Sequence, residues 1–338
     1  MKLCSADKLT DLAAALAAQG YRVIAPAADG DAVRLMEWTP GTAIDARQYP
    51  ANSAKDFLFP RSEVIGRYTL DGNDFTPQDV KPEAPKTVLL GVRPCDAAGL
   101  LLLDALFNWD YKDSFYNARR EATTVVSLAC SAADDQCFCT SVGGAPDSTV
   151  GADAVLRPAD GGKAFIFEAL TDKGKAVAAA AGHALAEGKA AADPPAKVPV
   201  RFNQKAVTEW CGANFESPLW RDVSLACLGC GACAYMCPTC HCFDIQDEST
   251  RRESVRHRNW DTCASALFTA HAGGHNPRSD QSARWRQRVM HKFRYLEERL
   301  NRLGCTGCGR CGRLCPAGMA ISRVCEQIEQ DSKAAAQR

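Results

Sequence analysis

Long apolar segments are missing from this chain of 338 residues. No run reaches the roughly 18 apolar residues that a membrane-spanning helix needs. The N-terminal sequence Met1-Lys2-Leu3-Cys4 opens no apolar stretch of signal-peptide length. We therefore expect a protein that has no membrane span and works in the reducing cytoplasm.

The chain also lacks a net charge, because 40 Lys and Arg residues balance 40 Asp and Glu residues. This balance gives no general electrostatic reason to expect a nucleic-acid partner. Nucleotide motifs are missing too, since no GxGxxG follows a predicted strand and no GxxxxGK(S/T) occurs. We expect this chain to bind neither NAD nor flavin, and to have no nucleic-acid partner.

Cysteine, in contrast, is abundant, with 18 residues. A disulfide framework is the first explanation to weigh for so many cysteines. Most of them, however, fall into short clusters with the spacing of metal ligands. Metal ligation in a reducing compartment therefore explains them better than disulfides do.

One cysteine pattern occurs twice near the C-terminus. Its two copies are Cys227-x2-Cys230-x2-Cys233-x3-Cys237-Pro238 and Cys305-x2-Cys308-x2-Cys311-x3-Cys315-Pro316. In the bacterial ferredoxin run of this form, three thiolates hold one iron–sulfur cube and the fourth serves the neighbouring cube. We therefore expect two [4Fe–4S] clusters with crossed ligand sets. The first set is Cys227, Cys230, Cys233 and Cys315, and the second is Cys305, Cys308, Cys311 and Cys237.

Structural zinc is the alternative, because paired CxxC motifs also form four-thiolate zinc sites. A zinc ribbon takes only two thiolates from each half, so the third and fourth cysteine of each run would have no role. The glycines between the ligands favour clusters, since backbone there must approach closely or turn with a positive φ. Those positions are Gly229, Gly231, Gly307, Gly309 and Gly312.

The N-terminal two-thirds of the chain predicts mixed α and β structure. Two apolar, β-branched segments, 87–92 and 123–128, predict buried strands, and the apolar segment 97–107 between them predicts a helix. We expect an α+β protein with a mixed α/β domain over residues 1–200. A helical dicluster ferredoxin-like domain over 201–326 and a flexible tail over 327–338 follow it. The long insert 250–303 between the cysteine runs is expected to be helical.

Four further cysteines follow the two predicted strands. If these strands are parallel neighbours, their C-terminal ends share the sheet edge where open α/β sheets bind ligands. The cysteines could then ligate a third iron–sulfur cluster, with Asp96 as a substitute ligand or supporting group. The alternative is a set of buried small side chains plus one dithiol. The four candidates are Cys95, Cys130, Cys137 and Cys139.

Cys240, Cys242 and Cys263 lie outside both runs. They could tune a nearby cube, bind a separate metal or fill the hydrophobic surroundings, and packing is the interpretation that we favour. The segment 251–302 carries twelve Lys and Arg residues against five Asp and Glu residues. It predicts a solvated face, a binding surface, or positive charge that raises the reduction potential of the clusters.

Several segments together resemble a known family, the beta subunits of cytoplasmic sulfhydrogenases and the corresponding iron–sulfur subunits of anaerobic sulfite reductases. The likeness extends upstream through Gly91-Val-Arg-Pro-Cys-Asp96 and Cys137-Phe-Cys-Thr140. The segments that carry it most specifically are Cys237-Pro-Thr-Cys-His-Cys-Phe-Asp244, Trp260-Asp-Thr-Cys263, Ala272-Gly-Gly-His-Asn276, His291-Lys-Phe-Arg-Tyr295 and Gly304-Cys-Thr-Gly-Cys-Gly-Arg-Cys311.

The resemblance implies a non-catalytic electron-transfer subunit of a cytoplasmic oxidoreductase complex in anaerobic metabolism. Its partners would be a flavin- and NAD(P)-binding reductase subunit and a catalytic subunit of the hydrogenase or sulfite/sulfur reductase type. Two other functions stay open. One is a zinc-stabilised scaffold or nucleic-acid-binding module that uses the basic segment. The other is a sulfur or disulfide reductase that uses Cys137 and Cys139 as a dithiol.

Overall fold

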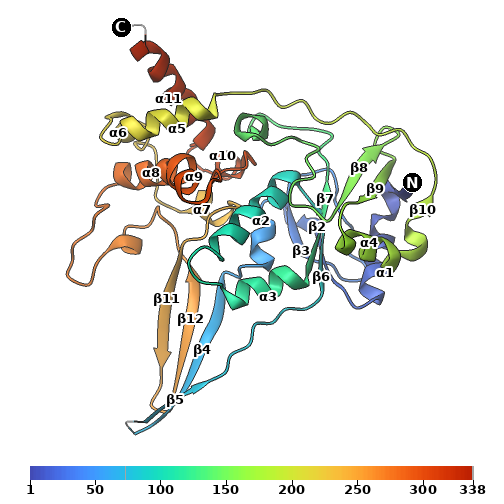
Figure 1. Ribbon diagram of the computed structural model, residues 1–338, viewed down its shortest axis with the longest axis horizontal. Coiled ribbons are helices and arrows are strands. Elements are labelled where there is room, and N and C mark those ends of the chain that lie inside the picture. Colours follow the sequence, from blue (N-terminus) through green and yellow to red (C-terminus); the bar gives the residue numbers. More distant parts are fainter. Residues whose placement is uncertain (73, 337–338) are drawn as a thin grey trace.

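The computed structural model describes residues 1–72 and 74–336, which form mixed α/β structure (Figure 1). Its main element is an eight-stranded sheet with the order β10-β1-β9-β8-β7-β6-β2-β3, in which β2, β6, β7 and β8 are parallel neighbours. The strands are β1 (Lys2–Ser5), β2 (Arg22–Asp29), β3 (Ala32–Glu37), β6 (Thr87–Val92), β7 (Thr123–Leu128), β8 (Ala154–Ala159), β9 (Ala164–Ala169) and β10 (Ala186–Glu187).

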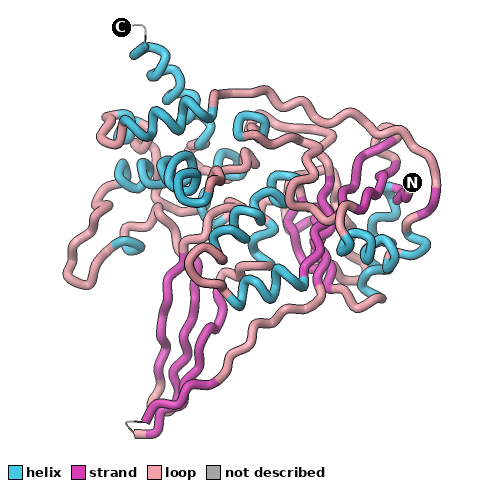
Figure 2. Tube along the Cα trace, in the orientation of Figure 1, coloured by secondary structure: helices cyan, strands magenta, loops and turns pink. Residues whose placement is uncertain are grey.

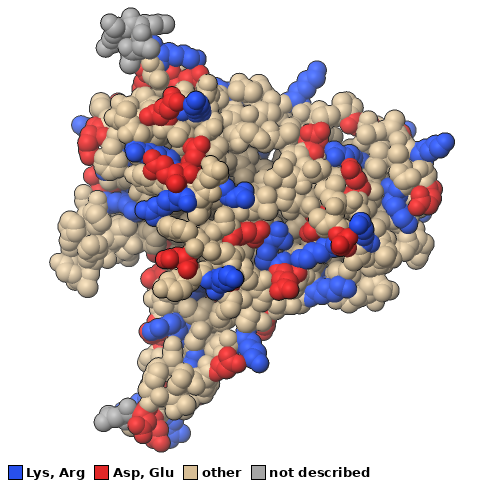
Figure 3. All heavy atoms as spheres, viewed as in Figure 1, with Lys and Arg blue, Asp and Glu red and all other residues tan. Residues whose placement is uncertain are grey.

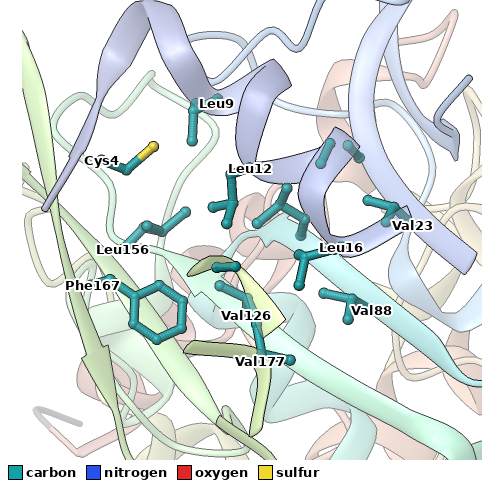
Figure 4. Packing of buried hydrophobic residues seen from close by; sticks show 14 of the residues in the cluster. Cys4, Leu9, Leu12, Leu16, Val23, Val88, Val126, Leu156, Phe167 and Val177 are labelled. Carbon is teal, nitrogen blue, oxygen red and sulfur yellow. The ribbon is translucent and has the colours of Figure 1, made fainter. Parts of the chain in front are cut away.

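Helices cover both faces of this sheet. On one face, α1 (Leu9–Ala18) and α4 (Asp172–Ala180) enclose a core that includes Leu12, Val88 and Val126 (Figure 4). On the other, α2 (Pro94–Leu106) and α3 (Ser114–Ala122) enclose a core with Leu89 and Val125. Successive side chains of β6 and β7 thus point to opposite cores, which explains why both strands are continuously apolar.

A second sheet projects from the body as a long arm, and β11 and β12 lie beside β4 along it (Figures 1 and 2). Its order is β11-β12-β4-β5. The strands are β4 (Ser62–Asp71), β5 (Asp74–Gln78), β11 (Phe243–Ser249) and β12 (Glu253–Trp260). The expectation that the insert 250–303 is helical is therefore wrong over its first half, because 253–260 is a strand that pairs with β4 and α-helix begins only at Gln281.

The pairing of β12 explains this error. Arg258 is buried and forms ion pairs with Glu63 of β4 and with Asp113. A charged residue at a buried position hides the alternation of apolar and polar residues that identifies a strand from sequence. The arm also joins the segments 1–200 and 201–326, because β4 and β12 belong to different predicted domains yet share one sheet.

Short helices dominate the C-terminal part. They enclose a core that includes Trp285, Val289, Phe293 and Ile328. The last helix runs to residue 336, so most of the expected tail 327–338 is helical, and residues 337–338 lie outside the described part. The helices are α5 (Gln204–Ala213), α6 (Leu219–Asp222), α7 (Ala232–Tyr235), α8 (Gln281–Met290), a π-helical turn (His291–Tyr295), α9 (Leu296–Leu300), α10 (Arg310–Arg313) and α11 (Ile321–Ala336).

The surface carries interspersed positive and negative side chains on the face shown in Figure 3. Among the described residues, no helix combines the length and apolar character needed to cross a membrane. The strands predicted at 87–92 and 123–128 are confirmed as β6 and β7, and the predicted helix between them is α2. The sheet thus positions the cysteine-bearing loops described next.

Candidate iron–sulfur sites

The first crossed ligand set lines a single cavity. Trp285, Met319 and Pro316 also line it. The amide of Gln281 donates a hydrogen bond to the Cys227 sulfur at 2.9 Å, and the backbone N–H of Gly229 donates to the same sulfur at 3.4 Å. Three cysteines of the first run and the last cysteine of the second run are thereby brought together. They are Cys227, Cys230, Cys233 and Cys315.

Two members of the second crossed set, Cys237 and Cys305, lie near Lys292. Its ammonium group donates to the Cys237 sulfur at 3.3 Å and to the carbonyl oxygen of Gly304, next to Cys305, at 2.7 Å. Burial is the main reason why the pKa of Cys305 rises to about 12, and the nearby Cys237 raises it further. Burial and Cys237 likewise raise the pKa of Cys308 to about 11, with Cys311 contributing less. Cys237 thus lies near Cys305 and Cys308, and Cys308 lies near Cys311.

The two runs adopt the same backbone conformation. Gly229 and Gly307 have φ values of 68° and 66°, and Gly231 and Gly309 both have 74°. Gly231 and Gly309 also directly precede the equivalent short helices α7 and α10. Because side chains disfavour this left-handed region, glycine at these four positions lets each run curl in the same way. The shared conformation fits a repeated cluster-binding loop.

The third set lies where the sequence predicted it, beyond the C-terminal ends of two parallel strands. Strands β6 and β7 are parallel neighbours, and Cys95 and Cys130 follow them. Burial and the neighbouring Cys130 and Cys137 raise the pKa of Cys139 to about 11. Cys95 and Cys139 also line a common pocket with Cys305. This set therefore adjoins the second one.

The loop 134–139 packs directly on the second cysteine run. The backbone N–H of Phe138 donates to the carbonyl oxygen of Gly307 at 3.0 Å. Arg313 of α10 donates to the Cys137 sulfur at 3.1 Å. A Cβ atom at Gly307 would lie 2.5 Å from the Cα atom of Cys139, so no side chain fits there. The backbones that carry the second and third sets are thus in contact.

Of the two roles considered for Asp96, its contacts favour the supporting group over the substitute ligand. Both of its carboxylate oxygens accept hydrogen bonds from Arg310, at 2.7 and 2.8 Å, in the buried interior. Arg310 also donates to the carbonyl oxygen of Pro50. Asp96 is therefore engaged in an ion pair between α2 and α10, and it is not free to replace a cysteine ligand.

Three buried cations near the cysteines were not singled out from the sequence. Lys55, Arg288 and Lys292 are only 2%, 5% and 4% exposed. Their hydrogen-bond acceptors are backbone carbonyls, Thr239 and cysteine sulfurs. Although burial alone would lower the pKa of Lys292, the neighbouring Cys237 and Cys240 raise it above its ordinary value.

Two of these three buried cations, Arg288 and Lys292, belong to the basic segment 251–302. Arg288 and Lys292 are four residues apart and lie on the buried side of one helical stretch. Other basic residues of the segment, such as Arg256 and Arg294, form ion pairs at the surface. The segment therefore combines a solvated face with cations that face the cysteines.

Among the described residues, no three His, Cys, Asp or Glu side chains come close enough to hold a single metal ion. In an iron–sulfur cube, each thiolate binds its own iron, so the ligands stand further apart than those of one ion. The glycine turns, the buried cations and the soft sulfur donors all fit such a cluster.

Comparison with known proteins gives two findings. Residues 226–319 match the family described as "4Fe-4S dicluster domain". Sulfhydrogenase 2 subunit beta of Pyrococcus furiosus is 28% identical over 295 residues, which cover 82% of this chain and 82% of that protein. A search of solved structures found no match. The resemblance to the iron–sulfur beta subunits of sulfhydrogenases is thereby confirmed.

Proposed function

We propose that this chain, an iron–sulfur protein similar over most of its length to a sulfhydrogenase beta subunit, relays electrons within a larger oxidoreductase complex. The observation that carries the proposal is the convergence of Cys227, Cys230 and Cys233 with Cys315 in one cavity. Such crossing is the arrangement expected of a two-cluster ferredoxin run. The similarity supports an iron–sulfur electron-transfer subunit in general, and the path of the electrons and the partners are what we propose in addition.

The proposed ligands are the two crossed sets and the four cysteines beyond β6 and β7. Bound at these sites, [4Fe–4S] clusters would supply reversible one-electron oxidation and reduction. The protein contributes burial of the sulfurs, the glycine turns that admit a cluster, and positive charge from Lys292 and Arg288. Positive charge beside a cluster favours its reduced, more negative state and so raises the reduction potential.

The sites form a row through the protein. The third set adjoins the second through the contact between Phe138 and Gly307, and the second and first sets exchange their fourth ligands. At the far end, Cys230 is exposed, and Leu225 and Leu228 beside it are 76% and 72% exposed. This apolar, exposed end supports docking of an electron-transfer partner there.

The proposed partners are a flavin- and NAD(P)-binding reductase subunit and a catalytic subunit, and the proposed location is the cytoplasm. The printed name of the relative, a sulfhydrogenase subunit, supports membership in a complex of several subunits. We propose that substrate chemistry takes place on the catalytic partner and not on this chain.

Isolation of the native complex with a Cys230→Ser variant tests the relay. We expect electron flow through the complex to fall at least tenfold, while the complex stays assembled and the other clusters remain. Cys4→Ser is the matched control, since Cys4 is buried among the core side chains around Leu9 and Leu12, far in the sequence from every proposed ligand. Full turnover of the Cys230→Ser complex would refute the relay.

A further inference from the structure

A fourth group of cysteines lines one cavity that none of the three proposed sets occupies. Cys240, Cys242 and Cys263 form its wall together with His241, His291, Arg288 and Lys292. From the sequence, packing was the favoured interpretation of these three cysteines. We propose instead that they hold a further iron–sulfur centre, with an imidazole from this wall in the fourth ligand position.

The base of the β11–β12 hairpin brings two of these cysteines together. Phe243 of β11 is paired with Trp260 of β12, and one step beyond, the backbone N–H of Asp261 donates to the carbonyl oxygen of Cys242 at 3.0 Å. Cys263 follows two residues later, so it is fixed close to Cys242. The hairpin thus serves as a rigid frame for ligands 21 residues apart in the sequence.

The buried positive charges around this cavity require a negative group close to them. Arg288 places Nη1 3.8 Å from the Cys240 sulfur, and its Nε atom has no hydrogen-bond partner. Lys55, from the N-terminal part, donates to the carbonyl oxygen of Cys240 at 2.9 Å. Buried cations are stable only when a neighbouring group compensates their charge. Neutral thiols do not compensate it, whereas a thiolate-ligated cluster does.

The histidine geometry matches that of a metal ligand. His241 places Nδ1 3.0 Å from the carbonyl oxygen of Thr239. Because a carbonyl oxygen can only accept, Nδ1 carries the hydrogen, and in the neutral ring Nε2 keeps its lone pair. Ligating histidines typically donate their other N–H to such a carbonyl. The ring centroid of His291 lies 5.3 Å from that of His241, so this wall offers a second imidazole as a candidate ligand.

The donors alone leave two types of centre. Three thiolates with an imidazole suit either zinc or iron–sulfur. Two cations of the cavity wall also contact the crossed sets, because Arg288 donates to the carbonyl oxygen of Cys233 and Lys292 donates to the Cys237 sulfur. Among the described residues, no three His, Cys, Asp or Glu side chains come close enough to hold a single metal ion, as a zinc site would require. We therefore assign an iron–sulfur centre.

Iron and acid-labile sulfide in the anaerobically purified full chain test this assignment. We expect Cys242→Ser and Cys263→Ser each to lose about four irons with as many sulfides, the content of one cube. Matched controls are Cys211→Ser and Cys325→Ser, because both cysteines are buried and lie outside every proposed set. The controls are expected to keep all their iron. Unchanged iron in the two test variants would overturn the assignment.

A second measurement needs no variant. It is alkylation of the native wild-type chain by iodoacetamide under anaerobic conditions. We expect no reaction at Cys240, Cys242 and Cys263 while the iron is bound. After a chelator and an oxidant have removed the iron, the three cysteines are expected to react. Release of zinc without acid-labile sulfide would overturn the assignment. A disulfide between Cys242 and Cys263 in a chain that still holds all its iron would overturn it too. Cys230→Ser removes a different cluster, so failure of this inference leaves the relay itself intact.

Discussion

Arg310 of α10 and Asp96 of α2 form a two-point ion pair, with Nη1 and Nη2 at 2.7 and 2.8 Å from the two carboxylate oxygens. The side chains are 4% and 0% exposed. The pair joins two segments that are 214 residues apart in the sequence; Asp96 directly follows Cys95, and Arg310 lies two residues after Cys308. The pair therefore holds the second cysteine run against the sheet edge that carries the third set.

Asp96→Asn is expected to destabilise the protein by about 3–5 kcal/mol, because it leaves a buried guanidinium without its counter-charge. Denaturant unfolding under anaerobic conditions measures the effect. Asp247→Asn removes an ion pair with Arg256 on the exposed arm and is expected to change stability little. Equal effects of the two substitutions would show that the buried pair does not hold the segments together.

Lys292→Gln is expected to lower the reduction potential of the cluster held by the second set. The substitution removes the ammonium that lies 3.3 Å from the Cys237 sulfur, and with it the charge that favours the reduced cluster. A redox titration followed by electron paramagnetic resonance measures the potential. Arg294→Gln, on the same helical stretch but in a surface pair with Glu298, is the control. An unchanged or higher potential in Lys292→Gln would contradict this role.

Gly307→Ala is expected to lower the free energy of unfolding. The loss should exceed the roughly 1–2 kcal/mol that a Cβ atom costs in the left-handed conformation. The φ of Gly307 is 66°, and the added Cβ would lie 2.5 Å from the Cα atom of Cys139, so the loop 134–139 must move away. Thermal unfolding and iron content measure the result. Gly273→Ala, where nothing lies within 4 Å, is the control. Wild-type stability and iron content in Gly307→Ala would show that this contact is dispensable.

The buried histidine pair predicts a loss of stability in acid. Burial lowers the pKa of His241 to about 4 and that of His291 to about 3, from an ordinary value of 6.5. Below pH 6.5 the unfolded chain binds protons that the folded chain does not, so the free energy of unfolding falls as the pH drops toward 4. Denaturant unfolding between pH 7.5 and pH 4.5 measures this slope.

His291→Asn is expected to flatten that slope, because the unfolded state then has one fewer histidine to protonate. His183→Asn, at an exposed position, is expected to keep the wild-type slope. A slope that is the same in all three proteins would refute the assignment of the acid sensitivity to the buried pair.

Local patterns in the sequence predicted the cysteine runs, strands β6 and β7, and the position of the third set, because spacing and apolar runs are properties of short segments. The arm was missed because its strand β12 is polar and pairs with β4, which lies almost 190 residues earlier. The cations were missed because burial of Lys55 or Arg288 depends on what folds around them. The Asp96–Arg310 pair likewise arises only when distant segments meet.

Iron and acid-labile sulfide per chain, measured on the full protein purified without oxygen, test the central claim most directly. The account predicts equal amounts of the two elements, about eight of each for the two crossed cubes and about four more for each further cube. With the third and fourth centres, both would reach about sixteen. Zinc in place of iron, with no acid-labile sulfide, would contradict the account.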